Sequence, residues 1–463
     1  MRQAIIDIGS NAIRAVVYDN RSLGAPEIYN DKFRSDIVSL LELDNLDVKH
    51  HTYLTLQYFS NIFQQLDVTQ INCVATAVLR EHPKAQDFVK LVKEKYNIDI
   101  DIISGEREAR LSALGLISGV TDANGIAVDL GGGSLEIIEI NERRVGALRS
   151  LELGTKKIDS SVTLDSLVDT INKAFPHKPS CPNLYLIGGG LRFIGRHYME
   201  FVRYPLRNLH HLEIAISDFL IYLEKMESIA QIQGSFQTYR IDHNATLIAK
   251  ALVKVLNPEK VVISNYGLKE GVRLMSLSEE EQVKDIIFER CKSLAAFNQS
   301  TCQLDKYNKL ITQLLIDPDK LTNDVVNLAV ILASFGKNID RTLKAHFTAE
   351  FILSSDIPFS HRQRLMLGLA TSHAFSSKKD LFINKLAHKI LSPLDYNNSQ
   401  IIGNVLRIVK EVDGPAFKHP SFNLQLRDRF IEITTNEILP KPIFESVCNR
   451  LKDIAFARKS AKY

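Results

Sequence analysis

The stretch Gly125–Ile140, GIAVDLGGGSLEIIEI, decides the fold expected for this chain. Apolar residues run up to Asp129, three consecutive glycines follow, and Ser134, Leu135 and Glu136 lead into a second apolar run. Two apolar runs joined by glycines predict a β-hairpin, because glycine is common at turns. Three glycines are more than a tight turn requires, and a loop without side chains lets backbone N–H groups converge on an anion. The stretch therefore predicts either an ordinary hairpin or a hairpin whose turn binds phosphate.

Residues Ala4–Tyr18 show nearly the same pattern close to the start of the chain. The letters AIIDIGSNAIRAVVY contain an apolar run, Asp7, a glycine turn with Ser10 and Asn11, and a second apolar run. Two such units suggest an internal duplication, in which two similar lobes each present one loop to a shared cleft. That arrangement would give a phosphate chain two cradles and a metal ion two aspartates.

Composition places the chain among ordinary globular proteins. Its 463 residues allow two or three domains, and 45% hydrophobic with 24% charged residues is typical of soluble proteins. A net charge of +3 is too small to indicate a nucleic acid or membrane partner. The five cysteines have no CxxC spacing, so neither a disulfide framework nor a zinc site is indicated. The chain shows no leader and no apolar run that could cross a bilayer, which predicts a cytoplasmic protein.

Strand-like and helical segments alternate through the first part of the chain, as in layered α/β domains. We expect a strand over 71–79 that ends at Arg80, a helix over 87–96 and a strand over 98–103, with a second lobe from about Asp122. From about residue 277 strand signals nearly vanish and leucines recur at helical spacing. Asp317-Pro318 and Ser392-Pro393 are expected to break helices there.

The motifs DIGSN and DLGGGSLE resemble the phosphate-1 and phosphate-2 loops of the actin/Hsp70/sugar-kinase superfamily. Within this superfamily, the residues of the two motifs resemble those of the exopolyphosphatase/guanosine pentaphosphate phosphohydrolase family. Three further blocks carry the resemblance in the same order: Ala75-Thr76-Ala77 with Arg80, Ile103-Ser104-Gly105 with Glu108-Ala109-Arg110-Leu111, and Ser264–Gly271. Five blocks in order are far more specific than any one of them.

The resemblance implies an α/β protein with two actin-like (ribonuclease H-like) lobes around a cleft, followed by an all-helical HD-like domain. The implied domains are residues 1–122, 123–276 and 277–463. Where relatives often have adjacent His-Asp, this chain has Ala333-Ser334. Metal ligation by an HD core needs those side chains, so we expect a degenerate, structural or binding domain. His361 and His373 are then expected at the solvent or at an interface.

The resemblance also implies the site residues. Glu108 matches the glutamate proposed to activate the attacking water, although Arg107 stands where many relatives carry a second acid. The candidate Mg²⁺ ligands are Asp7, Asp129 and Glu136, for which N-cap or turn roles are the alternative. Lys269 replaces a family arginine and loses its bidentate fork. The implied phosphate-binding residues are Ser10, Asn11, Arg14, Arg80, Gly131, Gly132, Gly133, Ser134 and Lys269.

The implied function is that of an exopolyphosphatase, which hydrolyses the terminal phosphoanhydride of inorganic polyphosphate with Mg²⁺. The alternatives are a guanosine pentaphosphate phosphohydrolase linked to the stringent response, and a non-catalytic sensor of polyphosphate or of guanosine penta- or tetraphosphate. A nucleotide kinase is the remaining rival, because Gly188-Gly189-Gly190-Leu191-Arg192 corresponds to the nucleotide-side loop of the superfamily's kinases. The family pattern there is closer to Gly-Gly-Thr, so Leu191 is a departure. A homodimer is left open.

Basic residues downstream of the second loop favour inorganic polyphosphate over a guanosine substrate. A long phosphate chain needs cations beyond the cleft, whereas a guanosine needs an aromatic or apolar slot, and no such slot is evident near the matched loops. Each of these residues alone could be an ordinary surface charge. The candidates are Lys156, Lys157, Arg192, Arg196, Arg203, Arg207 and Lys250.

Overall fold

Both glycine-containing stretches form the predicted hairpins. Their strands are the antiparallel pairs β1 (Arg2–Ile8) with β2 (Ala12–Tyr18), and β6 (Gly125–Leu130) with β7 (Leu135–Asn141). Equivalent backbone hydrogen bonds close the two turns: Gly9 N donates to Ala12 O (3.0 Å) and Gly131 N donates to Ser134 O (2.9 Å). The two stretches therefore fold alike.

The computed structural model describes most of the chain. The described residues are 1–10, 12–34, 36–43, 46, 49–159, 161–176, 180–232, 243–297, 304–333, 335, 339–340, 342–376, 382–414, 421–427, 430–435 and 438–460. They divide into two compact units, residues 1–204 with 209–286, and residues 205–208 with 287–463. Both hairpins belong to the first unit. The finer division at residues 122 and 276 stays a prediction.

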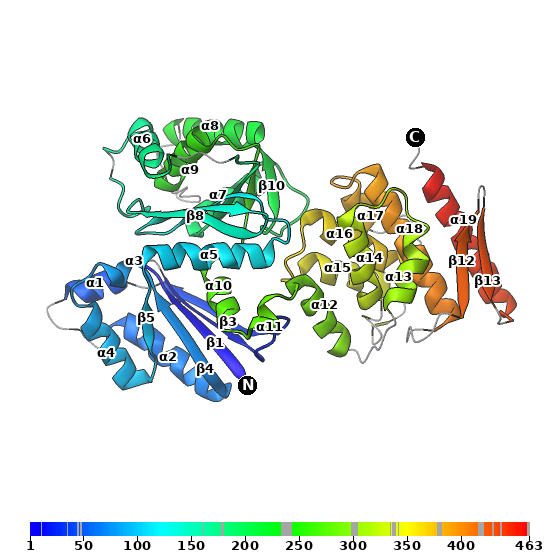
Figure 1. Cartoon of the computed structure of the whole chain (residues 1–463), viewed down its shortest axis with the longest axis horizontal. Coiled ribbons are helices and arrows are strands. Elements are labelled where there is room, and N and C mark those ends of the chain that lie inside the picture. Colours follow the sequence, from blue (N-terminus) through cyan, green and yellow to red (C-terminus); the bar gives the residue numbers. More distant parts are fainter. Residues whose placement is uncertain are drawn as a thin grey trace. The chain divides into compact units, whose positions relative to one another are not determined.

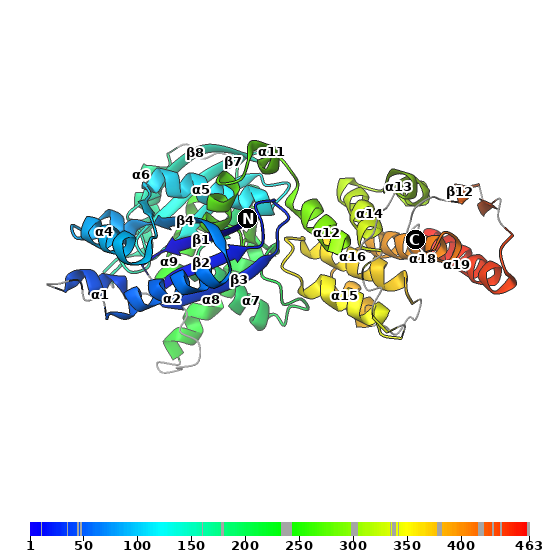
Figure 2. The ribbon, with the colours of Figure 1, turned by 90° about the horizontal axis from the view of Figure 1, so that it is seen from below.

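The two sheets of the first unit share one topology, which confirms the two-lobed α/β fold. The first sheet has the order β3-β2-β1-β4-β5, and β4, β1, β2 and β3 can be followed side by side in Figure 2. The second has the order β10-β11-β9-β6-β7-β8, so β8-β7-β6-β9-β11 repeats the first sheet and β10 adds an antiparallel edge. The remaining strands are β3 (Glu27–Arg34), β4 (Val68–Ala75), β5 (Ile100–Ile102), β8 (Arg144–Leu151), β9 (Asn183–Ile187), β10 (Leu212–Ala215) and β11 (Lys260–Ile263).

Helices cover the outer face of each sheet. In the first lobe, Phe59 and Phe88 pack with Ile6 and Ile8 of the central strand. The helices of this lobe are α1 (Ile37–Glu42), α2 (His51–Gln65), α3 (Ala77–Arg80) and α4 (Ala85–Tyr96). Those of the second lobe are α6 (Leu164–Ala174), α7 (Gly189–Phe201), α8 (Ile216–Ile232) and α9 (His243–Leu256). Figure 1 shows α2 and α4 on one side of the unit and α6, α8 and α9 on the opposite side.

The strand expected over 71–79 is wrong at its end. β4 stops at Ala75, and Ala77–Arg80 form the short helix α3. Thr76, in an extended conformation, is the N-cap, and its backbone carbonyl accepts hydrogen bonds from the amides of Leu79 and Arg80. The apolar pattern of this segment did not distinguish a strand from a short buried helix, as is usual for short apolar runs.

Two helices fill the space between the sheets, α5 (Gly105–Gly119) and α10 (Leu268–Met275) (Figure 1). Ala109, Ala113 and Leu116 of α5 pack on the second sheet. Leu111 of α5 and Val272 of α10 pack on the first sheet. The two helices also cross each other closely: a Cβ on Gly271 would lie 1.8 Å from Leu111 O, and one on Gly115 would lie 1.9 Å from Gly267 O. This crossing therefore ties the two lobes together.

The second compact unit is mainly helical, as predicted. Ser392 caps α18 and Pro393 is its first residue, which confirms the helix break expected there. The helices are α12 (Ile286–Phe297), α13 (Leu304–Thr312), α14 (Lys320–Leu332), α15 (Lys344–Ser354), α16 (His361–His373), α17 (Phe382–Ala387), α18 (Pro393–Val412) and α19 (Lys441–Ser460); the short α11 (Glu279–Gln282) belongs to the first unit. Among the helices of the described residues, none is both long and apolar enough to cross a membrane.

Two expectations for this unit need correction. It is not all-helical, because β12 (Phe422–Leu426) and β13 (Ile431–Thr435) form an antiparallel hairpin. His361 and His373 are not at the solvent: both are buried, with His361 Nε2 2.9 Å from Asn208 O and His373 Nε2 3.1 Å from Asn384 Oδ1. The alternative, a place at an interface, stays a prediction. Ala333 is buried, and Ser334 lies outside the described residues.

The helix crossing predicts which glycine tolerates a methyl group least. Gly271→Ala should lower the melting temperature strongly, with a loss at or beyond the upper end of the roughly 1–3 kcal/mol usual for overpacking, because the methyl group meets backbone. Gly189→Ala is the matched control, since a Cβ there would meet nothing within 4 Å. Thermal unfolding of the two variants checks this. Equal melting temperatures would contradict the close crossing.

Candidate active site

The equivalent hairpins place equivalent rows of side chains across the two sheets. In the first lobe Asp7 pairs with Arg14, and Arg14 pairs with Lys32 on β3. In the second lobe Asp129 pairs with Glu136, and Glu136 pairs with Ser150 on β8. Each row starts with an aspartate two residues before the first glycine of its turn. The rest of the row is basic in the first lobe, and acidic or neutral in the second.

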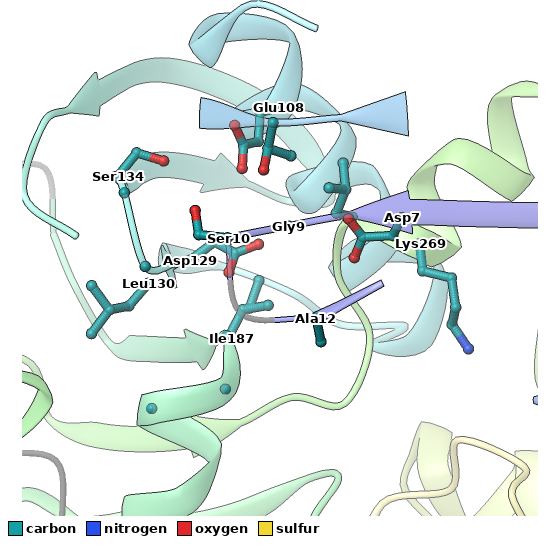
Figure 3. Close-up of a pocket in the computed structure, with 18 of the residues that line it drawn as sticks. Asp7, Gly9, Ser10, Ala12, Glu108, Asp129, Leu130, Ser134, Ile187 and Lys269 are labelled. Atoms are coloured by element: carbon teal, nitrogen blue, oxygen red, sulfur yellow. The ribbon is translucent and has the colours of Figure 1, made fainter. Parts of the chain in front are cut away.

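A cavity of about 280 Å³ lies between the lobes, and most of the predicted site residues line it. Figure 3 shows Glu108, Asp129, Ser10 and Ser134 gathered around one space. The lining comes from both hairpins, from the amino-terminal ends of α5, α7 and α10, and from β3. The lining residues are Asp7, Gly9, Ser10, Ala12, Arg14, Lys32, Thr76, Ala77, Glu108, Asp129, Leu130, Gly131, Gly132, Gly133, Ser134, Thr155, Ile187, Gly188, Gly189, Gly190, Arg192, Asn265, Leu268, Lys269 and Glu270.

Glu108 reaches the cavity from the first turn of α5. Ser104 caps this helix by accepting a hydrogen bond from the backbone N–H of Arg107 (3.2 Å). With the helix so placed, Glu108 is buried, whereas Glu106 and Arg107 are exposed. Arg107 Nη1 instead pairs with Asp101 Oδ2 (2.7 Å) outside the cavity. The structure thus brings Glu108, and neither of its neighbours, into the site.

The carboxyl group of Glu108 is poised to hold or release a proton near neutral pH. Burial raises its pKa to about 7, and the negative charge of Asp129 contributes, while Arg80 acts in the opposite direction. Arg80 Nη1 donates to Glu108 Oε2 (3.1 Å) and to Ile103 O (2.8 Å). A carboxyl group with such a pKa, fixed by an arginine, suits general acid–base chemistry.

Two of the three predicted metal ligands line the cavity, and the third does not. Asp7 and Asp129 line the cavity. Burial, followed by the charge of Asp129, raises the pKa of Asp7 to about 6. Glu136 is buried, accepts a hydrogen bond from Ser150 Oγ (2.8 Å) and is not among the lining residues. Its role as a ligand stays a prediction.

Ser112 supports Asp129 and was not recognised in the sequence. Its Oγ donates to Asp129 Oδ2 (2.6 Å), which holds one oxygen of that carboxylate in place. Burial raises the pKa of Asp129, and the Ser112 hydrogen bond opposes this rise. Ser112 follows Glu108 by one helical turn, so the spacing of four residues is the signal that could have identified it.

The two turns present the predicted phosphate-binding groups, with two differences. The Gly131 N–H is already used to close its turn, whereas Gly132 and Gly133 are its central residues. Asn11, the counterpart in the first turn, lies outside the described residues. Gly133 must be small, because a Cβ there would lie 2.9 Å from the Ala77 side chain.

The side chains predicted to bind phosphate through their positive charge have different partners. Arg14 lines the cavity, whereas Arg80 donates a hydrogen bond to Glu108. Lys269 Nζ is held by Glu27 Oε1 (3.0 Å) and Glu270 Oε1 (3.1 Å), and in Figure 3 its amine points away from the space beside Glu108. Burial alone would lower the pKa of Lys269, but Glu270 and other neighbours raise it above the ordinary value, so this lysine stays charged.

The loop after β8 joins the first lobe rather than forming an outward basic surface. Lys156 Nζ donates to Ser10 O (2.9 Å), and Lys157 Nζ pairs with Glu81 Oε2 (2.6 Å). The backbone of this loop also bonds to the second turn, from Lys156 N to Gly132 O (2.9 Å). Lys156 therefore connects the two hairpin turns, and Lys157 ties the same loop to the first lobe.

Comparison with known proteins assigns this architecture to one family. A profile of the Ppx/GppA phosphatase family matches residues 17–280, which is more than half of the 463 residues. A crystal structure of the Aquifex aeolicus family member is 18% identical and covers 59% of this chain and 96% of its own length, with a TM-score of 0.50. A second structure of the Aquifex aeolicus PPX-GPPA enzyme is 19% identical over 59% and 98%, with a TM-score of 0.51. An exopolyphosphatase from Cytophaga hutchinsonii is 20% identical over 58% and 96%, with a TM-score of 0.48.

The raised pKa of Glu108 predicts a pH-dependent cost in stability. Below its ordinary value of 4.5 this carboxyl is protonated in both states, and stability is lost as the pH rises towards about 7, because only the unfolded chain releases the proton. Glu108→Gln should therefore raise the melting temperature, with a gain that grows from pH 4 to pH 7 and approaches on the order of 3 kcal/mol. Thermal unfolding in metal-free buffer measures it.

Glu106→Gln is the control for this experiment, because Glu106 is exposed on the same helix. We expect no pH-dependent gain from it. A Glu108→Gln gain that is the same at every pH would show that the Glu108 carboxyl does not carry the cost.

Proposed function

Because the chain belongs to the Ppx/GppA phosphatase family, we propose that it is a Mg²⁺-dependent exopolyphosphatase that releases orthophosphate from the end of inorganic polyphosphate. The observation that carries this proposal is the composition of the cavity. A buried carboxyl with a pKa of about 7 lies in the same cavity as two glycine turns and two lobe aspartates. Phosphoryl transfer depends mainly on positioning and on charge stabilisation, and these groups supply both.

Glu108 would orient the attacking water and accept its proton. Arg80 holds one oxygen of its carboxylate, which leaves the other free to face the cavity. The turns of Ser10 and of Gly132–Gly133 would bind the oxygens of the terminal phosphate through backbone N–H groups and hydroxyls. In-line attack would then break the anhydride bond and release orthophosphate from the end of the chain.

Asp7 and Asp129 would hold the magnesium ion. The two carboxylates come from equivalent positions of the two lobes, and a cation would relieve their mutual repulsion. Within the described part of the chain, no three His, Cys, Asp or Glu side chains are grouped to form a metal site. Mg²⁺ needs no such group when water and substrate phosphates complete its shell. When bound, it would neutralise charge on the phosphate oxygens.

The lining of the cavity favours inorganic phosphate chains over guanosine phosphates. None of the described lining residues is aromatic, so the cavity offers no ring on which a base could stack. Arg192, in the first turn of α7, instead lines the cavity with a cationic group. Leu191 is fully buried in the second lobe, so its departure from the family pattern serves the core.

A non-catalytic sensor is the second candidate, and Lys269 is the observation that favours it. Glu27 and Glu270 form ion pairs with Lys269, so a cation that the sequence predicted for phosphate binding is already neutralised within the protein. A protein that only binds its ligand tolerates such a loss more easily than an enzyme does.

Phosphate release by the purified protein with Mg²⁺ separates these candidates. We expect long polyphosphate to be hydrolysed faster than guanosine pentaphosphate or ATP, and Glu108→Gln to lower turnover on the order of a hundredfold or more. Glu106→Gln should keep the wild-type rate. Binding of polyphosphate without turnover would favour the sensor, and a preference for guanosine pentaphosphate would favour the phosphohydrolase.

Asp129→Asn should change the metal requirement instead. Loss of one carboxylate charge weakens Mg²⁺ binding, so the Mg²⁺ concentration for half-maximal rate should rise about tenfold or more. Asp87→Asn, at an exposed position on α4, should leave this concentration unchanged. An unaltered Mg²⁺ titration for Asp129→Asn would remove Asp129 from the metal site.

A further inference from the structure

The row Asp7–Arg14–Lys32 has an unusual arrangement of like charges. Arg14 and Lys32 are direct cross-strand partners on β2 and β3, and like charges directly opposite each other destabilise a sheet. Arg14 Nε donates to the neutral side chain of Asn30 (2.9 Å). Within the described residues, Lys32 has no hydrogen bond or ion pair. Asp7 is the cross-strand partner of Arg14 on its other side, so the two cations share one carboxylate and keep a net positive charge that an anion could neutralise.

Arg192 brings a third cation to the same part of the cavity from the other lobe. Its Nε donates to Ser264 O (2.6 Å), and this bond fixes the guanidinium on α7. Its remaining nitrogens have no hydrogen-bond partner in the described part of the chain, although a guanidinium carries five donors. Arg14, Lys32 and Arg192 all line this cavity. Burial lowers the pKa of Lys32, the charges of Arg14 and Arg192 lower it further, and the charge of Asp7 raises it.

The acidic and basic rows give the cavity an asymmetric charge. The row of the second lobe continues from Asp129 to Glu136 and Ser150, and burial, followed by the charges of Glu108 and Asp129, raises the pKa of Glu136. Arg14 and Lys32 belong to the row that runs from Asp7 across the opposite sheet. An anion with one reacting end and a longer charged remainder suits this asymmetry.

We propose that Arg14, Lys32 and Arg192 form a second phosphate subsite, which binds the phosphate groups that follow the terminal one. The proposal rests on the proposed function, because it takes the terminal phosphate to lie beside Glu108. Arg14 and Lys32 come from the first lobe and Arg192 from the second. A chain of three phosphates is long enough to reach both the terminal site and this subsite, whereas a single orthophosphate is not. Lys32 and Arg192 are thereby specificity-determining residues for chain length.

Titration calorimetry of the full-length Glu108→Gln protein tests the subsite with two probes, inorganic tripolyphosphate and orthophosphate. Adding Lys32→Met or Arg192→Met should weaken tripolyphosphate binding on the order of tenfold each, because each removes a charge-assisted contact. Orthophosphate binding should change less than about twofold, because the turns and not the subsite hold it. Arg192→Lys should restore part of the affinity, and an unchanged melting temperature excludes unfolding as the cause.

Two exposed cations serve as matched controls. Arg196 lies one turn beyond Arg192 on α7 and is exposed, and the side chain of Lys90 on α4 is 76% exposed. Lys90→Met should leave both affinities unchanged. Arg196→Met should do the same for these two short probes, because Arg196 does not line the cavity and was expected to contact only longer phosphate chains. Equal losses with Arg196→Met would show a diffuse surface charge effect, and equal losses for both probes would place Lys32 and Arg192 at the terminal phosphate. Either result overturns the subsite.

The experiment separates failure of the subsite from failure of the proposed function. If the otherwise wild-type protein hydrolyses polyphosphate but Lys32→Met and Arg192→Met leave tripolyphosphate affinity unchanged, the function stands and the subsite is wrong. If the two substitutions weaken tripolyphosphate as expected but the wild-type protein releases no phosphate, the subsite stands and the protein is a binding protein.

Discussion

The contact between α5 and α10 is the constraint on which the site depends. Where the helices cross, backbone meets backbone at Gly115 and Gly271, with no room for a side chain. The same two helices begin at the cavity, α5 with Glu108 in its first turn and α10 with Lys269 and Glu270 in its own. Each helix also packs on a sheet whose hairpin turn lines the cavity. Fixing the crossing therefore fixes the Glu108 carboxylate relative to both hairpin turns.

The cavity is built at a cost in stability. Burial raises the pKa values of Glu108, Glu136 and Asp129, and the charge of Asp129 raises those of Glu108 and Glu136 further. Arg14 and Lys32 add a like-charge pair on the other side. Functional sites commonly hold such unfavourable arrangements, which the surrounding fold must offset. Here Ser112, Ser150 and Arg80 offset part of it by hydrogen bonding to the carboxylates.

The sequence predicted the hairpins from local patterns, whereas Glu108 was identified by the resemblance to a known family. An apolar run, an aspartate and a glycine turn specify a hairpin without reference to the rest of the chain, and a capped helix start fixes which of Glu106, Arg107 and Glu108 points inward. The two-lobed fold and the helical second unit could be predicted for the same reason. The hairpin of β12 and β13 could not, because its strands are short and only Phe422 and Leu424 are buried.

What the sequence could not predict are contacts between distant segments. Lys269 matched a phosphate-binding position by motif, but Glu27 lies far away in the chain and reaches Lys269 only through the fold. Arg192 was expected on an outward basic surface, and its cavity position depends on how α7 packs beside Ser264. Burial of His373 depends likewise on Asn384 of another helix. Each of these assignments needs a tertiary neighbour that no local pattern encodes.

The difference between the two duplicated rows gives the cleft a direction that duplication alone would not give. Two identical lobes would present the same row twice, and a phosphate chain would bind equally well in either orientation. After each shared aspartate the rows differ: Arg14 and Lys32 in one lobe stand where Glu136 and Ser150 stand in the other. The first row carries positive charge that would attract an anion, and the second carries carboxylates that would repel one unless a proton or a cation intervenes. Opposite charge at equivalent positions thus gives a duplicated scaffold an asymmetric cleft, as the proposed binding of a phosphate chain by one end requires.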